Sequence, residues 1–491
     1  MPCRSHAKAV YTALLSERGA GPGRIDELTR SASRSFLVDQ IGAVARLPCD
    51  FAADLRSLPT WLGKQNADAS SRYRRYLDDR HAGAPRRFFS SRSHALHFLR
   101  AVAPTKLVDG AWLYGLLPHW QEVRFSALIR IYLDELGQGR SAQNHVALYQ
   151  SLLAAHGCGG VERLGDEHFT QGAIQLALAH HAGEFLPEVI GFTLGYEQLP
   201  LHLPITAYEL AELDIDPYYF TLHVTVDNAA GGHATQALDG LIAALPRLGD
   251  CRTFLARVAS GYRLSAAGMG TEEAIQTFDL ERELLEMLAA KGAVGALLHS
   301  DHCRVGGKTV SEWLGSPEQL PNFLQALEGM GWIRRGQLPE NSRFWRMLSE
   351  EGAPMFGVFT PAEQQLIADW IASTPEGSPL ASTSAQKTTR PMVQRFRRPA
   401  AAKTADSASD RRPLPHGATV ADVLAHHLDE VSGNPSDFNA EPRILADTLA
   451  GVSDRSAAMS VLIGHLSPGN HATPAGLLAT RMVTALLDAR G

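Results

Sequence analysis

Apolar residues recur at three- and four-residue intervals, the period of an amphipathic helix, through most of residues 5–290. The apolar-polar alternation that marks a half-buried strand is scarce in the same region. Glycine and proline interrupt the pattern at short loops, as expected between neighbouring helices. The sequence therefore predicts an all-α fold, with helical segments that include Ser93–Val102, Leu107–Leu117, Glu122–Leu136 and Ala142–Ala155.

The chain of 491 residues is about three times the commonest domain size, so it should contain more than one domain. Residues 374–415 are rich in Ser, Thr, Ala, Pro, Arg and Lys and bury too little apolar surface to fold, which predicts a disordered linker. Because such a linker transmits no tight packing, we expect the core domain and its site to remain intact when the residues after about 375 are removed. The predicted divisions are an N-terminal helical segment that packs on the core (1–93), the core domain (94–270), a helical extension (271–373), the linker (374–415) and a small helical tail module (416–491).

Charge and cysteine content argue against several kinds of partner. Lys and Arg number 46 against 52 Asp and Glu, a formal net charge of -6, so no global positive field attracts nucleic acid or an anionic membrane. The 5 cysteines form no C-x-x-C pair, which disfavours a disulfide scaffold or a thiolate zinc site. No apolar run suits a signal peptide or a membrane span. We expect a cytoplasmic protein without nucleic-acid or membrane partners, and these features leave its oligomeric state open.

A carboxylate interrupts the apolar stripe of the segment Glu122–Leu136. Leu128, Ile131 and Tyr132 form this stripe, and the next position along it is Glu135. Burying an unpaired carboxylate costs free energy, so Glu135 should have a cationic partner, either a basic side chain or a metal ion. The alternative is a frayed helix end that leaves Glu135 in solvent.

Residues that commonly bind metals occupy apolar helix faces in two further segments. Glu197 ends the apolar face of residues 190–197, and His223 is followed one turn later by Asp227 on an aromatic face. A His and an Asp four residues apart can hold one ion, although such a pair more often forms a structural hydrogen bond. His233 comes six residues after Asp227, behind two glycines that would let the chain turn it inward.

Two more candidates lie near the first segment. His145 follows Glu135 by ten residues, and the glycines between them allow the chain to turn so that both side chains face one centre. We expect Ser141 to cap the helix that begins near His145. Asp109 lies upstream on an apolar stripe.

The order and spacing of these residues resemble the heme-oxygenase-like diiron oxidases and oxygenases, also called iron-containing redox enzymes. The resemblance consists of a Glu followed about ten residues later by a His, a Glu after Gly-Phe-x-Leu-Gly-Tyr, and His-x-x-x-Asp followed shortly by another His. It has motif support over about residues 95–250, and residues 340–360 resemble the C-terminal extension of longer members.

The resemblance implies a heme-oxygenase-like helical bundle that binds two Fe(II) ions per chain and uses O2 as a co-substrate. The expected activity is that of a nonheme diiron oxidase or oxygenase, which oxidises an amine or an amino-acid-derived small molecule by N-oxygenation, hydroxylation or oxidative C–C cleavage. An unidentified electron donor is implied, and no catalytic residue beyond the metal ligands is expected. The implied ligands are Asp109, Glu135, His145, Glu197, His223, Asp227 and His233.

Other classes remain as alternatives. A ferritin-like diiron protein normally carries Glu-x-x-His twice, and no Glu in this chain has a His three residues later. A heme-binding or heme-degrading protein of the same fold would use one His as an axial ligand, for which an acidic lining is unsuitable. A metal-free helical interaction protein is the third alternative, favoured by the additional C-terminal segments.

Overall fold

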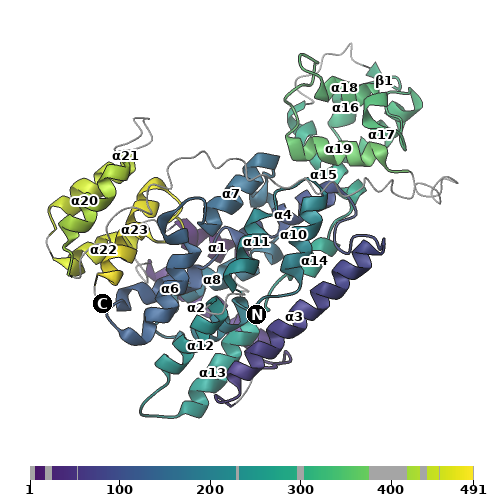
Figure 1. Cartoon of the computed structure of the whole chain (residues 1–491). Helices are drawn as coiled ribbons and strands as arrows, with labels where there is room; N and C mark the ends of the chain where they lie inside the picture. Colours follow the sequence, from purple (N-terminus) through teal and green to yellow (C-terminus); the bar gives the residue numbers. More distant parts are fainter. Residues whose placement is uncertain are drawn as a thin grey trace.

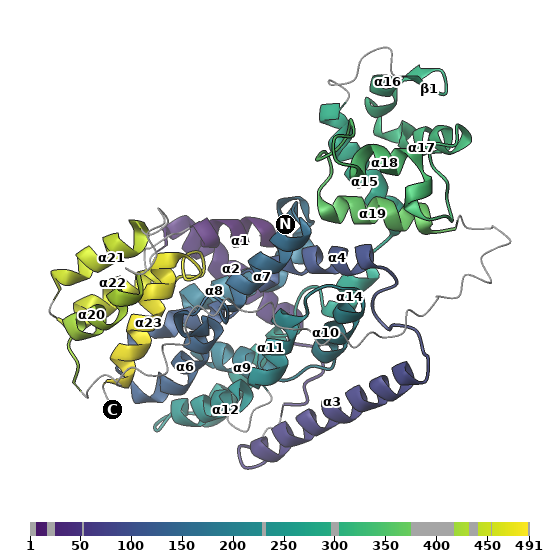
Figure 2. The ribbon, with the colours of Figure 1, turned by 45° about the horizontal axis from the view of Figure 1, so that its top comes forward.

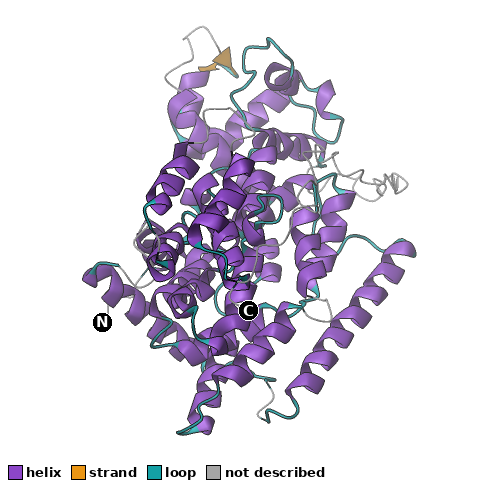
Figure 3. Ribbon diagram, turned by 60° about the vertical axis from the view of Figure 1, so that its left-hand side comes forward, coloured by secondary structure: helices purple, strands orange, loops and turns teal. Residues whose placement is uncertain are grey.

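The computed structural model describes residues 6–16, 25–51, 54–227, 232–295, 304–374, 417–431, 440–452 and 454–489. Helices make up almost all the regular structure of these residues (Figure 1; Figure 3). The strands in this part of the chain are β1 (Arg304–Val305) and β2 (Lys308–Thr309), which pair antiparallel. The predicted all-α fold class is confirmed.

Among the residues that the structure describes before the core, there are three helices. The first of them, α1, packs against the core helix α8 (Thr170–His181), and α2 begins at the N-cap Asp26, whose carboxylate accepts hydrogen bonds from two backbone N–H groups. The long helix α3 buries few of its side chains and lies along the outside of the molecule (Figure 2). Their bounds are α1 (Ala7–Ser16), α2 (Glu27–Val44) and α3 (Leu58–His81).

The core is a bundle whose interior is filled by large apolar side chains such as Trp112, Tyr132 and Phe192. Its α-helices are α4 (Arg92–Ala101), α5 (Ala103–Lys106), α6 (Ser126–Glu135), α7 (His145–His156), α8 (Thr170–His181), α9 (Leu186–Tyr196), α10 (His202–Glu212), α11 (Tyr218–Asp227), α12 (His233–Ala244), α13 (Cys251–Leu264) and α14 (Thr271–Gln276). Its 3-10 helices are η1 (Ala111–His119), η2 (Val123–Phe125), η3 (Gly137–Gly139), η4 (Val161–Arg163) and η5 (Asp166–Phe169).

The predicted helix Leu107–Leu117 is instead a turn followed by the 3-10 helix η1. Gly110 causes the break, because its φ of 78° lies in the left-handed region that glycine tolerates best. A Cβ atom on Gly110 would also lie 2.9 Å from the Cβ of Glu135. This glycine therefore allows the turn that carries Asp109 to approach the end of α6.

The extension has a hydrophobic core of its own, with Trp313, Leu348 and Trp370 among its buried side chains. It is drawn in green, set off from the bundle (Figure 1). Polar contacts join it to α4, including one from the Ser93 N–H to the Asp369 carboxylate at 2.8 Å. Its remaining elements are α15 (Leu280–Gly295), α16 (Val310–Leu314), η6 (Pro317–Gln319), α17 (Leu320–Gly329), η7 (Pro339–Asn341), α18 (Arg343–Ser349) and α19 (Pro361–Ala372).

In the described part of the tail, four helices share the hydrophobic core of the bundle. Its final helix lies beside η3, where Gly139 touches the backbone of Leu477 so closely that a Cβ would be only 2.4 Å from the Leu477 carbonyl oxygen. The Tyr132 hydroxyl donates a hydrogen bond to the Leu466 carbonyl at 2.5 Å. The helices are α20 (Val420–Val431), α21 (Ala440–Ala450), α22 (Arg455–His465) and α23 (Pro474–Asp488).

The tail does not pack as a separate module, because the tail and the bundle share one apolar cluster. The sequence of the intervening linker carries no information about this packing. Apart from Thr374, the predicted linker 374–415 lies outside the described residues. Across the described residues, no helix is both long enough and apolar enough to cross a membrane.

Candidate metal centre

Six of the seven predicted ligands meet at one buried place inside the bundle. They come from separate elements: the turn before η1, the last residue of α6, the first residue of α7, the end of α9, the middle of α11 and the first residue of α12. None is more than 7% exposed. These six residues are Asp109, Glu135, His145, Glu197, His223 and His233.

The first group consists of Asp109, Glu135, His145 and His223, whose ligand-type atoms all lie within 4.8 Å of one another. His145 Nδ1 is 2.5 Å from Glu135 Oε2 and 3.9 Å from Asp109 Oδ2. His223 Nε2 is 3.0 Å from the same Asp109 oxygen. Two carboxylates and two imidazoles thus face a common point.

The second group consists of Glu135, Glu197 and His233. His233 Nδ1 is 3.0 Å from Glu197 Oε2 and 3.2 Å from Glu135 Oε1. Glu135 therefore belongs to both groups and turns one oxygen toward each. The seventh predicted ligand, Asp227, is the last residue of α11, and its side chain lies outside the described residues.

The turn between α6 and α7 places Glu135 and His145 side by side, as the sequence predicts. The N-cap of α7 is Asn144 rather than Ser141, because the Asn144 side-chain oxygen accepts a hydrogen bond from the Ala147 N–H at 3.0 Å. The Asn144 amide also donates to the Leu136 carbonyl at 3.2 Å, which ties the start of α7 to the end of α6.

Neighbouring groups orient the His223 ring. Its Nδ1 lies 2.8 Å from the backbone carbonyl of Tyr219, so Nδ1 carries the proton and donates it there. In the neutral ring, the lone pair is then on Nε2, which faces Asp109. The Tyr219 hydroxyl donates to Asp109 Oδ2 at 2.6 Å and holds that carboxylate in place.

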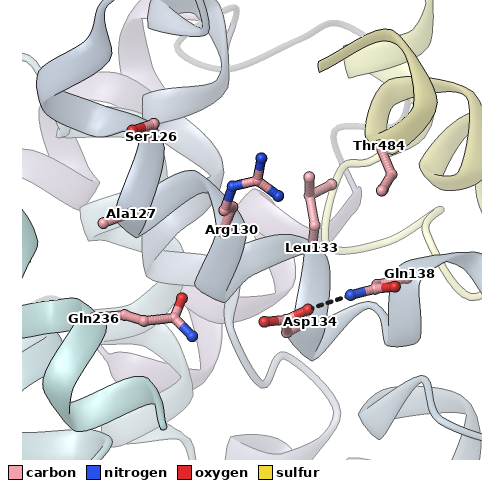
Figure 4. A pocket seen from close by; sticks show the side chains of 8 residues that line it. All are labelled: Ser126, Ala127, Arg130, Leu133, Asp134, Gln138, Gln236 and Thr484. Atoms are coloured by element: carbon pink, nitrogen blue, oxygen red, sulfur yellow. Dashed lines mark hydrogen bonds between the residues drawn. The ribbon is translucent and has the colours of Figure 1, made fainter. Parts of the chain in front are cut away.

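His233 faces a second carboxylate on its far side. Its Nε2 lies 3.7 Å from Asp134 Oδ2, and Asp134 accepts a hydrogen bond from the Gln138 amide at 2.7 Å. Asp134 lines an open pocket of about 340 Å³ between α6, α12 and α23, together with Arg130 and Gln236 (Figure 4). Asp134 therefore lies between His233 of the second group and this pocket.

Unsatisfied oxygens and N···O distances in the cluster show whether a metal ion would fit there. Asp109 Oδ1 and Glu197 Oε1 are buried and have no hydrogen-bond partner among the described residues. Ligand atoms at about 2.1 Å from a shared ion, and at right angles to one another, are about 3 Å apart. Several N···O separations here are close to that value. The donor set and its unsatisfied oxygens therefore fit metal ions.

Burial and neighbouring charges shift the pKa values of the cluster in opposite directions. Burial opposes ionisation of Glu135, but the charge and hydrogen bond of His145, with those of His233, outweigh it and hold the pKa of Glu135 well below its usual value. Burial, reinforced by nearby carboxylates, raises the pKa of Glu197. Burial alone would lower the pKa of His233, yet Glu197, Asp134 and Glu135 raise it far above its usual value.

Sequence reasoning missed the residues that support the ligands. Lys106 lowers the pKa of Asp109 against the opposing effect of burial, and it precedes that aspartate by three residues, a spacing that could have pointed to it. His471 of the tail is buried, with a pKa lowered to about 4, and its Nδ1 accepts a hydrogen bond from the Asn144 amide at 3.1 Å. Nothing in the local sequence around His471 indicates this contact.

Among the described residues, these two groups are the places where at least three potential metal ligands lie close enough together to hold an ion. The adjacent histidines of α8 do not join them. His181 Nε2 instead lies 2.9 Å from the Ser33 hydroxyl of α2.

Residues 96–266 match the model of a family described as iron-containing redox enzymes. The matched segment contains all seven predicted ligands. The resemblance expected from the sequence is confirmed. No curated protein and no solved structure matches the chain.

Proposed function

We propose that the protein is a nonheme diiron oxidase or oxygenase that uses O2 to oxidise a small molecule. The observation that carries this proposal is the position of Glu135 between two groups of buried ligands, with one oxygen turned toward each. A carboxylate in that position can bridge two ions. The family match supports iron as the metal, and carboxylate and imidazole ligands suit iron.

The two groups divide the ligands between two sites. One ion would take Asp109, His145 and His223, the other would take Glu197 and His233, and Glu135 would serve both. Asp227 is a further proposed ligand, because its backbone is one helical turn beyond His223. Six or seven ligands that share one carboxylate suit two ions better than one.

Two ferrous ions at this centre would supply electrons for the reduction of O2. The protein contributes position and exclusion of water, since Tyr149, Tyr219 and Phe220 are buried around the first group. The carbonyl of Tyr219 fixes the tautomer of His223, and its hydroxyl restrains Asp109.

The substrate, reaction outcome and reductant belong to the same proposal. The activities implied by the resemblance are N-oxygenation, hydroxylation or oxidative C–C cleavage of an amine or amino-acid-derived molecule in the cytoplasm. An electron donor is required if the cycle consumes more electrons than the substrate provides. A heme-binding function is less well supported, because all three histidines point at carboxylates within about 3 Å.

Iron stoichiometry tests the proposal directly. Full-length protein is titrated with Fe(II) without oxygen, desalted, and analysed for iron and by Mössbauer spectroscopy. We expect two iron ions per chain in a spectrum typical of a coupled pair after exposure to O2. Saturation at one ion per chain, or a Soret band after heme addition with no iron binding, would contradict the proposal.

A further inference from the structure

The candidate metal centre and the open pocket beside it share a wall made by α6 and α12. On α6, Asp134 lines the pocket, and the next residue, Glu135, belongs to both ligand groups. On α12, His233 belongs to the second group, and Gln236 lines the pocket about one helical turn later. Figure 4 shows Asp134 and Gln236 on these two helices, with Thr484 of α23 completing the lining. The pocket therefore adjoins the second ligand group.

Asp134 connects this pocket to the buried ligands. None of the six clustered ligands is more than 7% exposed, whereas the Asp134 side chain keeps 29% of its accessible surface. Its Oδ2 lies 3.7 Å from His233 Nε2. The other ring nitrogen, Nδ1, faces Glu197 at 3.0 Å and Glu135 at 3.2 Å. A path from solvent past Asp134 to the second group thus crosses one side chain, the ring of His233.

The lining of the pocket suits a hydrated cation better than an apolar molecule. Of its eight lining residues, six carry a polar or charged side chain, and Ala127 and Leu133 are the other two. Pockets that bind organic ligands are lined mostly by apolar side chains. Oxygens such as those of the Asp134 carboxylate and the Gln236 amide are ligands that divalent cations accept together with water.

The charges at the pocket also favour a cation. Arg130 is the cationic residue of the lining, and its guanidinium pairs with Asp488 of α23 at 3.1 Å. The Gln138 amide donates a hydrogen bond to Asp134 at 2.7 Å, which holds that carboxylate at the pocket wall. Arg130, Asp488 and Asp134 together carry one net negative charge. The pocket should therefore attract cations rather than anions.

We propose that divalent cations enter the centre through this pocket, with Asp134 as the side chain that receives the hydrated ion. The proposal rests on the proposed function, because it assumes that the second group holds an iron ion. Asp134 offers one carboxylate, whereas Glu135, Glu197 and His233 offer three ligands to the same ion. The ion is held more tightly there and does not stay at Asp134. The ring of His233 must turn aside for the ion to pass.

The competing explanation is that Asp134 only orients His233 and that ions enter elsewhere. A change at the pocket would then alter how tightly iron is held, but not how fast it enters. The rate of iron uptake therefore separates the two explanations, and the final iron content reports on the proposed function.

The experiment blocks the pocket reversibly in the full-length protein. Ala127→Cys places a thiol in the lining, outside both ligand groups, and a bulky aromatic thiol is attached to it through a disulfide. Metal-free protein is mixed with Fe(II) without oxygen, and timed samples are quenched with a chelator, desalted and analysed for iron. We expect the adduct to slow uptake of at least one ion at least about tenfold, because it obstructs access, with the final iron content unchanged. Removal of the adduct with a reductant, followed by desalting, should restore the rate.

Two controls separate blockage of the pocket from general effects of the label. Wild-type protein treated with the same reagent reports on the native cysteines, of which Cys251 is exposed. Thr12→Cys places the same adduct in another open pocket, at α1. Unchanged uptake in labelled Ala127→Cys, or equal slowing in either control, would overturn the proposal. Protein that binds no iron even without the label contradicts the proposed function instead.

Variants of Asp134 assign the effect to its carboxylate and keep the test decisive if Ala127→Cys does not fold. Asp134→Asn should slow uptake of one ion at least about threefold, and Asp134→Glu should recover most of the rate because it keeps the charge. Added salt should slow uptake more in wild-type protein than in Asp134→Asn, since salt screens exposed charges. Asp239→Asn, an exposed position on α12, is the matched control. Uptake at the wild-type rate in Asp134→Asn, with faster release alone, would support the orienting role and overturn the proposal.

Discussion

The two ligand groups differ in what holds them. In the first group, His223 and Asp109 are both fixed by Tyr219, and His145 begins a helix whose N-cap Asn144 contacts the tail. In the second group, His233 is backed by Asp134, which lines an open pocket. Two sites that share one carboxylate can therefore differ in how tightly they hold their iron ions. We expect the first site to depend on the packing of core and tail, and the second to be more easily lost.

Removal of the tail should have the largest effect. A chain ending at Thr374 exposes apolar surface that α22 and α23 cover, and it loses the contact between His471 and Asn144. We expect loss of iron at both sites and a fall in Tm of at least about 10 °C, since several buried side chains at about 1.5–3 kcal/mol each are exposed. The measurements are iron analysis and thermal denaturation. A soluble truncated chain that retains two iron ions would show that the first group does not need the tail.

Glu135→Ala should remove iron from both sites while the protein remains folded. The substitution deletes the carboxylate shared by the two groups and leaves His145 and His233 without a partner they now contact. Circular dichroism checks the fold, and iron analysis checks the sites. The control is Glu122→Ala, which alters a more exposed carboxylate near the start of the same segment. Retention of one iron ion in Glu135→Ala would mean that this residue serves only one site.

Single histidine substitutions should separate the two sites. His223→Ala is expected to lose the first ion and His233→Ala the second, each leaving about one ion per chain. His181→Ala is the matched control, because this buried histidine contacts Ser33 outside the centre and should leave both ions in place. Mössbauer spectra of the two variants should differ if the sites are distinct. Identical spectra of the two variants would show that the two ligand groups do not form distinct iron sites.

The second site should also lose iron as the pH falls. The pKa of His233 is raised far above its usual value in the metal-free protein, so iron must displace a proton from it at neutral pH. The apparent Kd of that site should therefore increase about tenfold per unit of pH decrease between pH 8 and 6. Titrations of the His223→Ala variant at several pH values report on this site alone. A Kd independent of pH would show that His233 is not a ligand there.

The same proton should stabilise the metal-free fold. Because the pKa of His233 is higher in the folded than in the unfolded chain, its contribution is fully present below about pH 6.5 and is lost as the pH rises toward the folded value. The raised pKa of Glu197 acts in the same direction. We expect a higher Tm for metal-free protein at pH 6 than at pH 8, with a smaller difference in His233→Ala.

Asp134→Asn should have the smallest effect. Removal of the charge that faces His233 Nε2 weakens the orientation of the ring, and such supporting groups typically change metal affinity about tenfold or more. Only the second site should be affected. The control is Asp239→Asn, which alters an exposed carboxylate on the same helix as His233. If Asp134→Asn instead weakened iron binding at the first site, the assignment of Asp134 to the second site would be wrong.

The sequence predicted the fold class from helical periodicity, and local patterns together with the family resemblance predicted the residues that cluster at the centre. Glu135 interrupts an apolar stripe, and His145 follows it across a turn rich in glycine, so a short stretch of chain contains the evidence for both. The predicted helix over 107–117 was wrong because Gly110 adopts a left-handed conformation, which periodicity does not report. Asp227 stays a prediction, since its side chain lies outside the described residues.

The sequence by itself therefore determined that the fold is helical and which positions carry residues that can bind a metal, because helical period and side-chain type are local properties. Only the tertiary structure decided that Glu135 lies between two ligand groups, that Asp134 lies between His233 and an open pocket, and that His471 reaches Asn144. These relations join residues that are distant in the chain. They depend on how helices approach and cross in a packed core, where the distances follow from the shapes of many side chains together.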